Sequence, residues 1–350
     1  MGGAERQVVD IADRCRERGH EVKIAYLTGE QFIRPRSDDI QVMGLGMRKN
    51  PVGFVQAYAK LVKILRSYGP DVVHSHMVHA NLLARLVRMS CPMPKLICTA
   101  HSKNEGGRIR MLAYRMTDFL ADLSTNVSFE AVEAFEKKGA VPPGLMLAIS
   151  NGIDTQRFQR SDSARDLIRA REGVCDDEKV VLAVGRLTEA KDYPNLFQAF
   201  KELANTDQRT RLWIIGDGEL RERLEYIVNS HHWGKRVRFL GFQNEISHWM
   251  NAADVFVLSS AWEGFGLVVA EAMACEKVTV ATDAGGVKEV IGDCGYLVPV
   301  RDSKALSEAL MQALSLCPKE ASKLGARGRE RIVNDYSLDS AVERWLSIYK

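Results

Sequence analysis

The sequence lacks the long apolar runs and the organised cysteines that define several classes of protein. No stretch approaches the ~18 consecutive apolar residues of a membrane-spanning helix, and no secretory signal is visible. The seven cysteines are odd in number, scattered, and never spaced as Cys-x-x-Cys. This argues against a disulfide framework and a zinc cluster, and it is typical of a reducing compartment. We therefore expect a cytoplasmic protein that is soluble or peripheral to a membrane.

A strong excess of one charge is also missing. The formal net charge is +3, and no compact run of Lys and Arg is interleaved with aromatic residues, which argues against a nucleic-acid partner. The charge is unevenly placed, because residues 1–150 contain 21 Lys and Arg against 15 Asp and Glu, and the remainder contains 27 against 30. A basic N-terminal half suits an anionic membrane or a phosphate-bearing substrate. Chance variation in a solvated surface is the alternative.

Short apolar runs alternate with amphipathic stretches along the whole chain. This pattern is typical of βαβ units with parallel sheets, and 350 residues are enough for about two such domains. We expect strands at 21–26, 71–74, 95–99, 123–127, 180–184, 211–215, 237–240, 254–259 and 278–282. We expect helices at 5–18, 54–67, 81–89, 108–120, 193–203, 220–230, 246–252, 267–275, 287–291, 303–315, 319–334 and 338–349.

Turn chemistry in the segment 151–154 marks a boundary between two domains. We expect a Rossmann-like domain over 1–153 and a second over 154–337, with the C-terminal helix in 338–350 packing back on the first. A doubly wound domain normally starts with a strand, whereas this chain runs from Met1 almost directly into a helix. We therefore expect the first strand of the N-terminal sheet to be missing, and a version extended upstream to be more stable and soluble.

The most informative segment is Glu263-Gly264-Phe265-Gly266-Leu267-Val268-Val269-Ala270-Glu271. We expect Glu263 in a strand-to-helix loop, where glycines let a ligand approach the backbone, and Glu271 about one turn inside the helix. The N–H groups at a helix start attract an anion. A carboxylate beside them is expected to bind another part of the ligand, most simply sugar hydroxyls. A core helix with two incidental glutamates is the alternative.

Two further glycine-containing loops follow strands in the same half. Arg186 and Lys191, in the loop after strand 180–184, are five positions apart and suit one anion. Arg supplies a planar fork of donors and Lys a compact charge, which fits the two phosphates of a nucleotide diphosphate. A solvated basic loop is the alternative. Gly216-Asp217-Gly218 follows the next strand, and it is either a turn near the same ligand or a purely structural one.

The N-terminal half offers candidate residues at two places. Gly2 and Gly3 open a helix whose N–H groups are expected to face the cleft between the domains and to contact donor phosphates or the acceptor. His101 comes just after a strand, and ligands bind at the carboxyl ends of strands in open α/β sheets. A structural histidine is the alternative at this position.

Three further histidines lie close together in sequence, at 74, 76 and 79. We expect His74 to point away from His76, and no carboxylate lies near them in sequence. We therefore predict no metal site there. His76 remains a candidate for contact with an acceptor.

Taken in order, these motifs resemble those of the retaining glycosyltransferases of family 4, of the bacterial polysaccharide or O-antigen type. The resemblance covers nearly the whole chain and also includes segment 151–158, which is similar to the family's interdomain signature. It implies the GT-B fold, an α/β architecture of two facing Rossmann-like domains with parallel sheets. It also implies transfer of a sugar from a nucleotide diphosphate sugar, with a UDP-sugar favoured. That molecule is a substrate, so no cofactor and no metal are expected.

The resemblance also implies roles for individual residues. The donor diphosphate is assigned to Arg186 and Lys191, and the ribose hydroxyls to Glu271. The donor sugar is assigned to Glu263 and the N–H groups around Phe265, Gly266 and Leu267. Gly216 is expected near the donor, and His101 at the transferred sugar. Glu263, His101, Arg186 and Lys191 are thus the expected catalytic set. In such enzymes a phosphate oxygen of the leaving group is thought to take the acceptor's proton, so no protein nucleophile is needed.

The acceptor is predicted from the basic N-terminal half and from a helix that carries Arg108, Arg110 and Arg115. We expect a glycan or an undecaprenyl-diphosphate-linked sugar at the cytoplasmic face of the inner membrane, as in lipopolysaccharide O-antigen or capsule assembly. Gly2, Gly3, His76 and Arg108 are expected on the acceptor side of the cleft.

Two alternatives remain. A sugar-nucleotide epimerase shares the GT-B shape but needs acid and base carboxylates that the sequence does not reveal. A non-catalytic module that binds a sugar nucleotide is the second. An NAD-dependent oxidoreductase is disfavoured, because no Gly-x-Gly-x-x-Gly motif is present.

Overall fold

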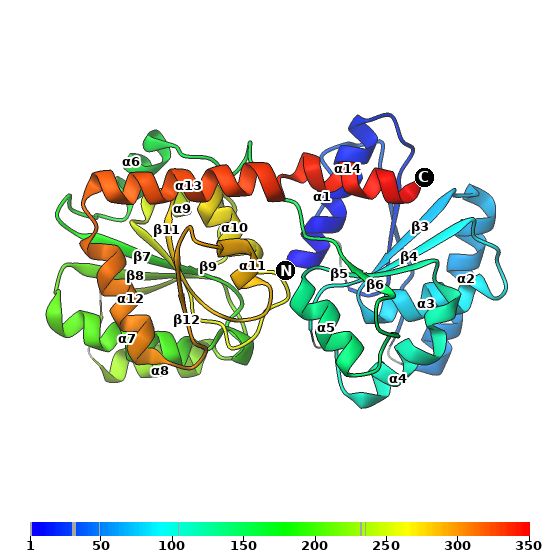
Figure 1. The fold of residues 1–350 in the computed structure, drawn as a ribbon, viewed down its shortest axis with the longest axis horizontal. Helices are drawn as coiled ribbons and strands as arrows, with labels where there is room; N and C mark the ends of the chain where they lie inside the picture. Colours follow the sequence, from blue (N-terminus) through cyan, green and yellow to red (C-terminus); the bar gives the residue numbers. More distant parts are fainter. Residues whose placement is uncertain (1, 30–32, 49, 104, 232, 235) are drawn as a thin grey trace. The chain divides into compact units, whose positions relative to one another are not determined.

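The computed structural model describes residues 2–29, 33–48, 50–103, 105–231, 233–234 and 236–350, which form two units (Figure 1). Unit 1 comprises Met1–Gly152 and Leu338–Lys350, and unit 2 comprises Ile153–Ser337. The sequence analysis placed the boundary after Ile153 and the C-terminal helix with the N-terminal half. Both units are α/β, and their paired strands are parallel.

Unit 1 carries two separate parallel sheets, β1-β2 and β3-β4-β5-β6. Its strands are β1 (Lys23–Tyr26), β2 (Gln41–Gly44), β3 (Val72–His76), β4 (Lys95–Ala100), β5 (Leu123–Asn126) and β6 (Met146–Ala148). Its helices are α1 (Gly3–Glu17), α2 (Pro51–Tyr68), α3 (Val78–Arg88), α4 (Arg108–Thr117), the 3₁₀ turn η1 (Asp118–Leu120), α5 (Phe129–Lys137) and α14 (Leu338–Tyr349). Among the described residues no strand joins β1 to β3, so the strands of this unit form two sheets. The expected absence of a first strand stays a prediction.

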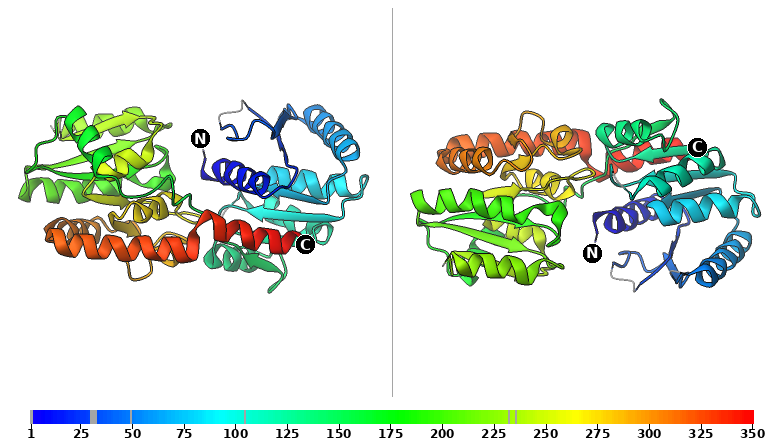
Figure 2. Two further views of the ribbon diagram at one scale, coloured as in Figure 1. Left: turned by 90° about the horizontal axis from the view of Figure 1, so that it is seen from above. Right: turned by 90° about the horizontal axis from the view of Figure 1, so that it is seen from below.

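The C-terminal helix α14 belongs to the core of unit 1. Its apolar residues Leu338, Val342 and Trp345 pack with Ile11 and Cys15 of α1. Helices α1 and α14, dark blue and red, are therefore in contact, and they cross in the view of Figure 1 and lie next to each other in the views of Figure 2. Helix α14 packs on α1 because its apolar face would otherwise be exposed to water.

Unit 2 is one six-stranded parallel sheet in the order β12-β11-β10-β7-β8-β9. Its strands are β7 (Lys179–Val184), β8 (Thr210–Ile215), β9 (Val237–Gly241), β10 (Val255–Leu258), β11 (Val278–Thr282) and β12 (Tyr296–Val298). Its helices are α6 (Asp162–Arg171), the 3₁₀ turn η2 (Glu189–Lys191), α7 (Tyr193–Thr206), α8 (Arg221–Ser230), α9 (Ile246–Ala252), α10 (Leu267–Ala274), α11 (Val287–Ile291), α12 (Ser303–Ser315) and α13 (Pro318–Tyr336). The chain runs from β7 through β8 to β9 on one side, then continues from β10 on the other. Strands β7 and β10 thus flank the switch point of the sheet.

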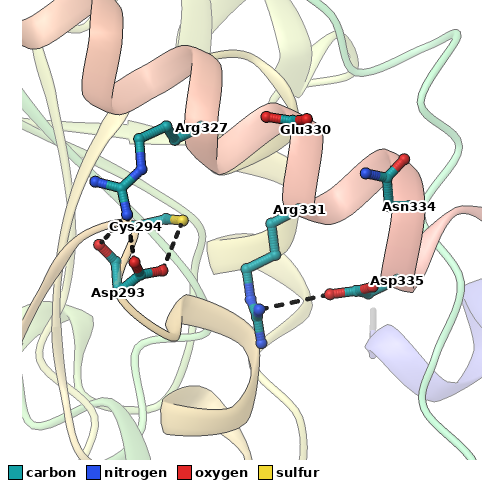
Figure 3. A pocket seen from close by; sticks show the side chains of 7 residues that line it. All are labelled: Asp293, Cys294, Arg327, Glu330, Arg331, Asn334 and Asp335. Carbon is teal, nitrogen blue, oxygen red and sulfur yellow. Dashed lines mark hydrogen bonds and ion pairs between the residues drawn. The ribbon is translucent and has the colours of Figure 1, made fainter.

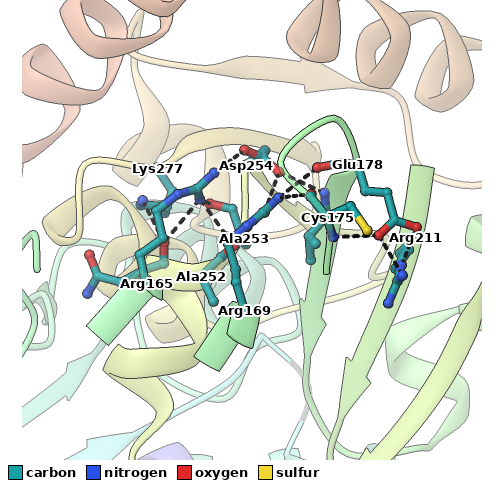
Figure 4. Close-up of polar contacts among 11 residues, drawn as sticks. Arg165, Arg169, Cys175, Glu178, Arg211, Ala252, Ala253, Asp254 and Lys277 are labelled. Carbon is teal, nitrogen blue, oxygen red and sulfur yellow. Dashed lines mark hydrogen bonds and ion pairs between the residues drawn. The ribbon is translucent and has the colours of Figure 1, made fainter. Parts of the chain in front are cut away.

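A polar cluster holds β10 against β7 at the N-terminal ends of these strands, away from the switch-point loops (Figure 4). Asp254, just before β10, accepts a 2.8 Å hydrogen bond from the backbone N–H of Val180 in β7. Its carboxylate also pairs with Arg165 at 2.7 Å and Arg169 at 3.2 Å, both on α6. Because the carboxylate bridges two strands and a helix, it secures the alignment on which the loops at the other strand ends depend.

Most of the expected strands and helices are present, with shifts of a few residues at their ends. The sequence analysis did not assign β2, β6, β12, α5 or α6. The three strands are only three or four residues long, which is too short for a clear apolar period. The helix expected over 108–120 is wrong at its end, since α4 stops at Thr117 and the 3₁₀ turn η1 follows.

Candidate active site

The loops that carry the expected donor residues meet at the switch point of the unit 2 sheet. The loop after β7 contains Arg186 and Lys191, and the loop after β10 contains Glu263. The two loops are joined by a 2.8 Å hydrogen bond from Ala261 N–H to the carbonyl of Ala190. In open α/β sheets ligands bind in the crevice outside the strand carboxyl ends at such a point. The fold therefore brings both loops to the position where an α/β protein holds its ligand.

Lys191 and Glu263 contact one another directly at this position. The ammonium of Lys191 forms an ion pair with Oε1 of Glu263, and their side chains are only 17% and 15% exposed. The same oxygen accepts a 2.6 Å hydrogen bond from the hydroxyl of Ser260. The hydroxyl of Tyr193 donates to the carbonyl of Gly185 at 3.1 Å, and burial, with the charge of Glu263, raises the pKa of that phenol. The sequence analysis missed Ser260 and Tyr193 as parts of this site.

The other expected cation is arranged differently. Arg186 is exposed to solvent, and within the described ranges its guanidinium has no ion-pair partner. Next to it, Gly185 and Gly216 approach so closely that a Cβ on Gly216 would lie 2.0 Å from the carbonyl oxygen of Gly185. Gly216 also has φ of 134°, a backbone conformation that residues other than glycine rarely adopt. Gly216 thus has a steric reason to be glycine, whatever else it contacts.

Helix α10 starts within the same loop. Gly266 is its N-cap in the left-handed conformation, with φ of 85°, and no side chain caps the helix. Phe265 is buried at 3% exposure and packs edge-on against Tyr336 with ring centroids 5.6 Å apart. The side chain of Phe265 is therefore structural, and only its backbone is placed to contact a ligand. Leu267 is the first residue of α10, and Glu271 lies one turn further along it.

In unit 1, His76 and His101 lie next to each other. His76 ends β3, His101 follows β4, and Nδ1 of His76 is 3.0 Å from Nε2 of His101. The expectation that His74 points away from His76 is wrong, because their ring centroids are 4.0 Å apart. Residues i and i+2 of a strand lie on the same face, so these two rings must be neighbours. Burial lowers the pKa of His101 to about 4 and that of His74 to about 3.

The remaining expected residues of unit 1 lie at helix starts. Helix α1 begins at Gly3 with Gly2 as its N-cap. The carboxylate of Glu5 turns back toward Gly2, so closely that a Cβ on Gly2 would lie 2.3 Å from it. Arg108 is the first residue of α4 and is exposed. The half-buried Glu105, which the sequence analysis missed, accepts a 2.8 Å hydrogen bond from the backbone N–H of His101.

Helix α4 and the turn η1 present large apolar side chains to solvent. Met111 and Tyr114 face the core, while the exposed side chains occur at spacings of three and four: Ile109, Leu112, Met116 and Phe119. Arg108, Arg110 and Arg115 are exposed on the same helix. We call these seven side chains the α4 patch. No helix in the described part of the chain is long and apolar enough to span a bilayer.

A surface pocket of about 240 Å³ lies beside α13, far in sequence from the loops that carry Lys191 and Glu263 (Figure 3). It is lined by Asp293, Cys294, Arg327, Glu330, Arg331, Asn334 and Asp335. Its arginines are paired with carboxylates, Arg327 with Asp293 and Arg331 with Asp335. Among the described residues no group of three or more His, Cys, Asp or Glu is arranged to hold a metal ion.

Comparison with known proteins gives matches over both units. A model for glycosyl transferases group 1 matches residues 164–331, and a model for glycosyltransferase family 4 matches residues 1–157. The N-acetyl-alpha-D-glucosaminyl L-malate synthase of Bacillus anthracis is 25% identical and aligns with 100% of this chain and 94% of its own. A UDP-Gal:alpha-D-GlcNAc-diphosphoundecaprenol alpha-1,3-galactosyltransferase of Escherichia coli is 25% identical, over 84% of this chain and 79% of its own.

Solved structures give the same fold. The structure of Anabaena HepE in complex with UDP and glucose has a TM-score of 0.86 and 23% identity, covering 99% of this chain and 95% of its own. A glycosyltransferase from Rickettsia africae also has a TM-score of 0.86, at 19% identity, covering 100% and 94%. With the two family models on the two units and this shared architecture, the chain belongs to the family 4 glycosyltransferases and has the GT-B fold.

Proposed function

We propose that this enzyme moves a sugar from a UDP-sugar to a glycan or lipid-linked acceptor, with retention of configuration and without a metal ion. The observation that carries the proposal is the ion pair of Lys191 and Glu263 at the switch point of the unit 2 sheet, beside the start of α10. A cation, a carboxylate and the N–H groups at the start of a helix lie in one place, and together they match the phosphates and hydroxyls of a nucleotide sugar.

In this proposal the donor separates the ion pair. Lys191 turns to the diphosphate together with Arg186, and the two cations stabilise the charge that builds on the leaving phosphate as the glycosidic bond breaks. Glu263 is then free to accept hydrogen bonds from the hydroxyls of the sugar. The backbone N–H groups at the start of α10 contact the same part of the donor, and Glu271 takes the ribose hydroxyls.

Retention follows from the face on which the acceptor attacks. The acceptor hydroxyl attacks the anomeric carbon from the face of the leaving group, and an oxygen of the departing phosphate takes its proton. Neither a protein nucleophile nor a metal is then required. A ¹H NMR spectrum of the glycoside product reports the anomeric configuration of the new bond, and its comparison with that of the donor tests retention. Unchanged turnover in EDTA tests independence from metal.

The nature of both substrates is inferred from relatives. HepE is described in complex with UDP and glucose, and the Escherichia coli relative is named for UDP-Gal and a diphosphoundecaprenol acceptor. Other relatives are named for lipopolysaccharide core biosynthesis. An acceptor that carries a lipid diphosphate also suits the basic charge of residues 1–150.

The α4 patch supports peripheral contact with an anionic membrane at the cytoplasmic face. Four large apolar side chains of the patch are exposed to water, which is unfavourable for a soluble monomer. Three exposed arginines lie on the same helix. An amphipathic helix with this composition lies in the plane of the interface and is attracted by anionic headgroups. Contact there would bring the enzyme to a lipid-linked acceptor.

A thermal-shift screen across UDP-, GDP- and ADP-sugars tests the donor. A ligand at 100 times its Kd stabilises the folded state by about 2.7 kcal/mol, so a UDP-sugar should raise Tm clearly and the others less. The failure of every nucleotide sugar to raise Tm would overturn the proposal. Turnover of a nucleotide sugar without any acceptor would instead favour the epimerase.

A further inference from the structure

His76 is held in an unusual local environment at the end of β3. It pairs in the sheet with Thr99 of β4, two positions before His101. The next residue, Met77, has φ of 70° and ψ of 158°, a backbone region that is essentially confined to glycine. Such a conformation costs about 1–3 kcal/mol and tends to occur at functional positions. The strained residue thus directly follows His76 in the chain.

The ring of His76 is fixed on two sides. On one side the ring of His74 packs against it, with ring centroids 4.0 Å apart and the ring planes tilted by 34°. His74 itself is anchored at both nitrogens, by the hydroxyl of Tyr349 at 2.7 Å and by that of Thr99 at 2.6 Å. On the other side Nδ1 of His76 lies 3.0 Å from Nε2 of His101. His76 is therefore locked between a rigid neighbour and His101.

His101 is held through its backbone as well. Its N–H donates to Oε1 of Glu105 at 2.8 Å, and the other oxygen of Glu105 accepts a 2.6 Å hydrogen bond from Tyr114. Within the described residues, the His101 ring has one hydrogen-bond partner, His76, and its Nδ1 has none. One nitrogen of His101 is thus committed to His76, and the other remains available to a ligand.

The contact between the two rings decides where their protons lie. Two neutral imidazoles can share a hydrogen bond only if one carries its proton on the contacting nitrogen and the other does not. If Nε2–H of His101 donates to Nδ1 of His76, both rings carry the proton on Nε2, which is the tautomer that neutral histidine favours in water. The opposite arrangement would force both rings into the less stable tautomer. Burial keeps both rings neutral by lowering the pKa of each.

We propose that His76 is a positioning residue that holds His101 in the neutral Nε2–H tautomer, so that Nδ1 of His101 offers its lone pair to a substrate hydroxyl. This rests on the proposed function and on the role at the transferred sugar that the family resemblance implies for His101. His76 then acts through His101 and does not itself bind the acceptor.

The test compares three substitutions of His76 by ¹⁵N NMR of the His101 ring, without any substrate. In His76→Asn the amide oxygen lies near the position of Nδ1 and can still accept from His101. His76→Gln places its amide further out, and His76→Leu removes it. We expect a single Nε2–H form of His101 in the wild type and in the Asn variant, and a mixture of tautomers in the other two. His20→Asn, at an exposed histidine of the same unit, is the matched control.

Three results of the NMR experiment would overturn the proposal: a mixture of His101 tautomers in the wild type, an unchanged tautomer in His76→Leu, or equal rescue by Asn and Gln. If His76→Leu does not fold, the comparison of Asn with Gln decides the question alone. Because these spectra need no turnover, they remain decisive even if no sugar transfer is found.

Kinetics then link the tautomer to the reaction. We expect kcat to fall about tenfold in His76→Gln and His76→Leu, which corresponds to about 1.4 kcal/mol of activation free energy, with the donor KM unchanged. His76→Asn should stay close to the wild type. A change in donor KM with unchanged kcat would count against positioning of His101. Absence of transfer by the wild type with any donor would refute the proposed function and leave the NMR result standing.

Discussion

Lys191 and Glu263 form an ion pair across the switch point of the unit 2 sheet, although 72 positions separate them in the sequence. Both side chains are largely buried, and Ser260 donates a further hydrogen bond to the same carboxylate oxygen. The two groups therefore satisfy each other when no ligand is bound. A donor that binds there has to replace the ion pair with its own contacts. The stability of the folded protein is therefore linked to donor binding.

The first prediction concerns the strength of this pair. Removing either partner leaves a largely buried charge unpaired, whereas removing both does not. We expect Lys191→Met and Glu263→Gln each to destabilise the protein, and the double variant to lose less than the sum, with a coupling of about 1–2 kcal/mol. Urea unfolding of the four proteins measures the coupling free energy. Additive losses would mean that the ion pair contributes nothing to folding.

The second prediction concerns Arg186. Its exposed guanidinium pairs with no carboxylate among the described residues, so Arg186→Ala should leave Tm within about 1 °C, since surface substitutions usually change stability by less than about 0.5 kcal/mol. The kcat/KM for the donor should fall about 10²–10³-fold, as for the loss of one donor to a developing negative charge. Arg223→Ala, an exposed arginine on α8, is the control. Equal activities of the two variants would remove Arg186 from the site.

The third prediction separates steric clash from backbone strain at Gly216. A Cβ there would meet the carbonyl of Gly185 at 2.0 Å, whereas at Gly173, which has φ of 61°, it would meet no atom within 4 Å. Gly173→Ala should cost about 1–2 kcal/mol for its left-handed backbone. Gly216→Ala should cost about 3 kcal/mol or more, because the clash adds to the strain. Similar unfolding free energies for the two variants would contradict this geometry.

The fourth prediction concerns the α4 patch. In flotation with vesicles that contain anionic lipid, we expect the wild type to bind and a double variant, Ile109→Ser with Phe119→Ser, to stay in solution. These side chains are 84% and 80% exposed, so their loss should not affect folding. Phe242→Ser, at a similarly exposed residue of unit 2, should bind like the wild type. Equal binding to neutral and anionic vesicles would argue against a role for the arginines.

The fifth prediction concerns pH. The pKa of His101 is about 4 and that of His74 about 3 in the folded state, both lowered by burial. Between these values and the usual 6.5 the unfolded chain binds more protons, so stability rises with pH and is lost as pH falls below about 6.5. We expect His101→Gln to flatten this dependence by about 1.4 kcal/mol per pH unit between pH 6 and pH 4.5.

Chemical unfolding at a series of pH values measures this dependence. If the curves of the wild type and His101→Gln run parallel, burial of His101 contributes nothing to acid sensitivity.

Much of the fold follows from local pattern. The alternation of apolar strands and amphipathic helices predicts parallel sheets, and the glycine-containing loops after strands are recognisable without any structure. Short edge strands such as β2 and β12 were missed because three or four residues carry too little periodicity. The orientation of His74 was predicted wrongly, although strand geometry alone places it on the same face as His76.

The sequence by itself determined which residue types can bind a nucleotide sugar: two cations after one strand and two carboxylates around a Gly-aromatic-Gly turn after another. Only the tertiary structure decided that Lys191 pairs with Glu263, that Phe265 is buried by Tyr336, and that His76 contacts His101. The reason is physical. Residue type and spacing act within one loop or helix, whereas these contacts depend on which strands become neighbours in a sheet. That order is set by packing over the whole unit.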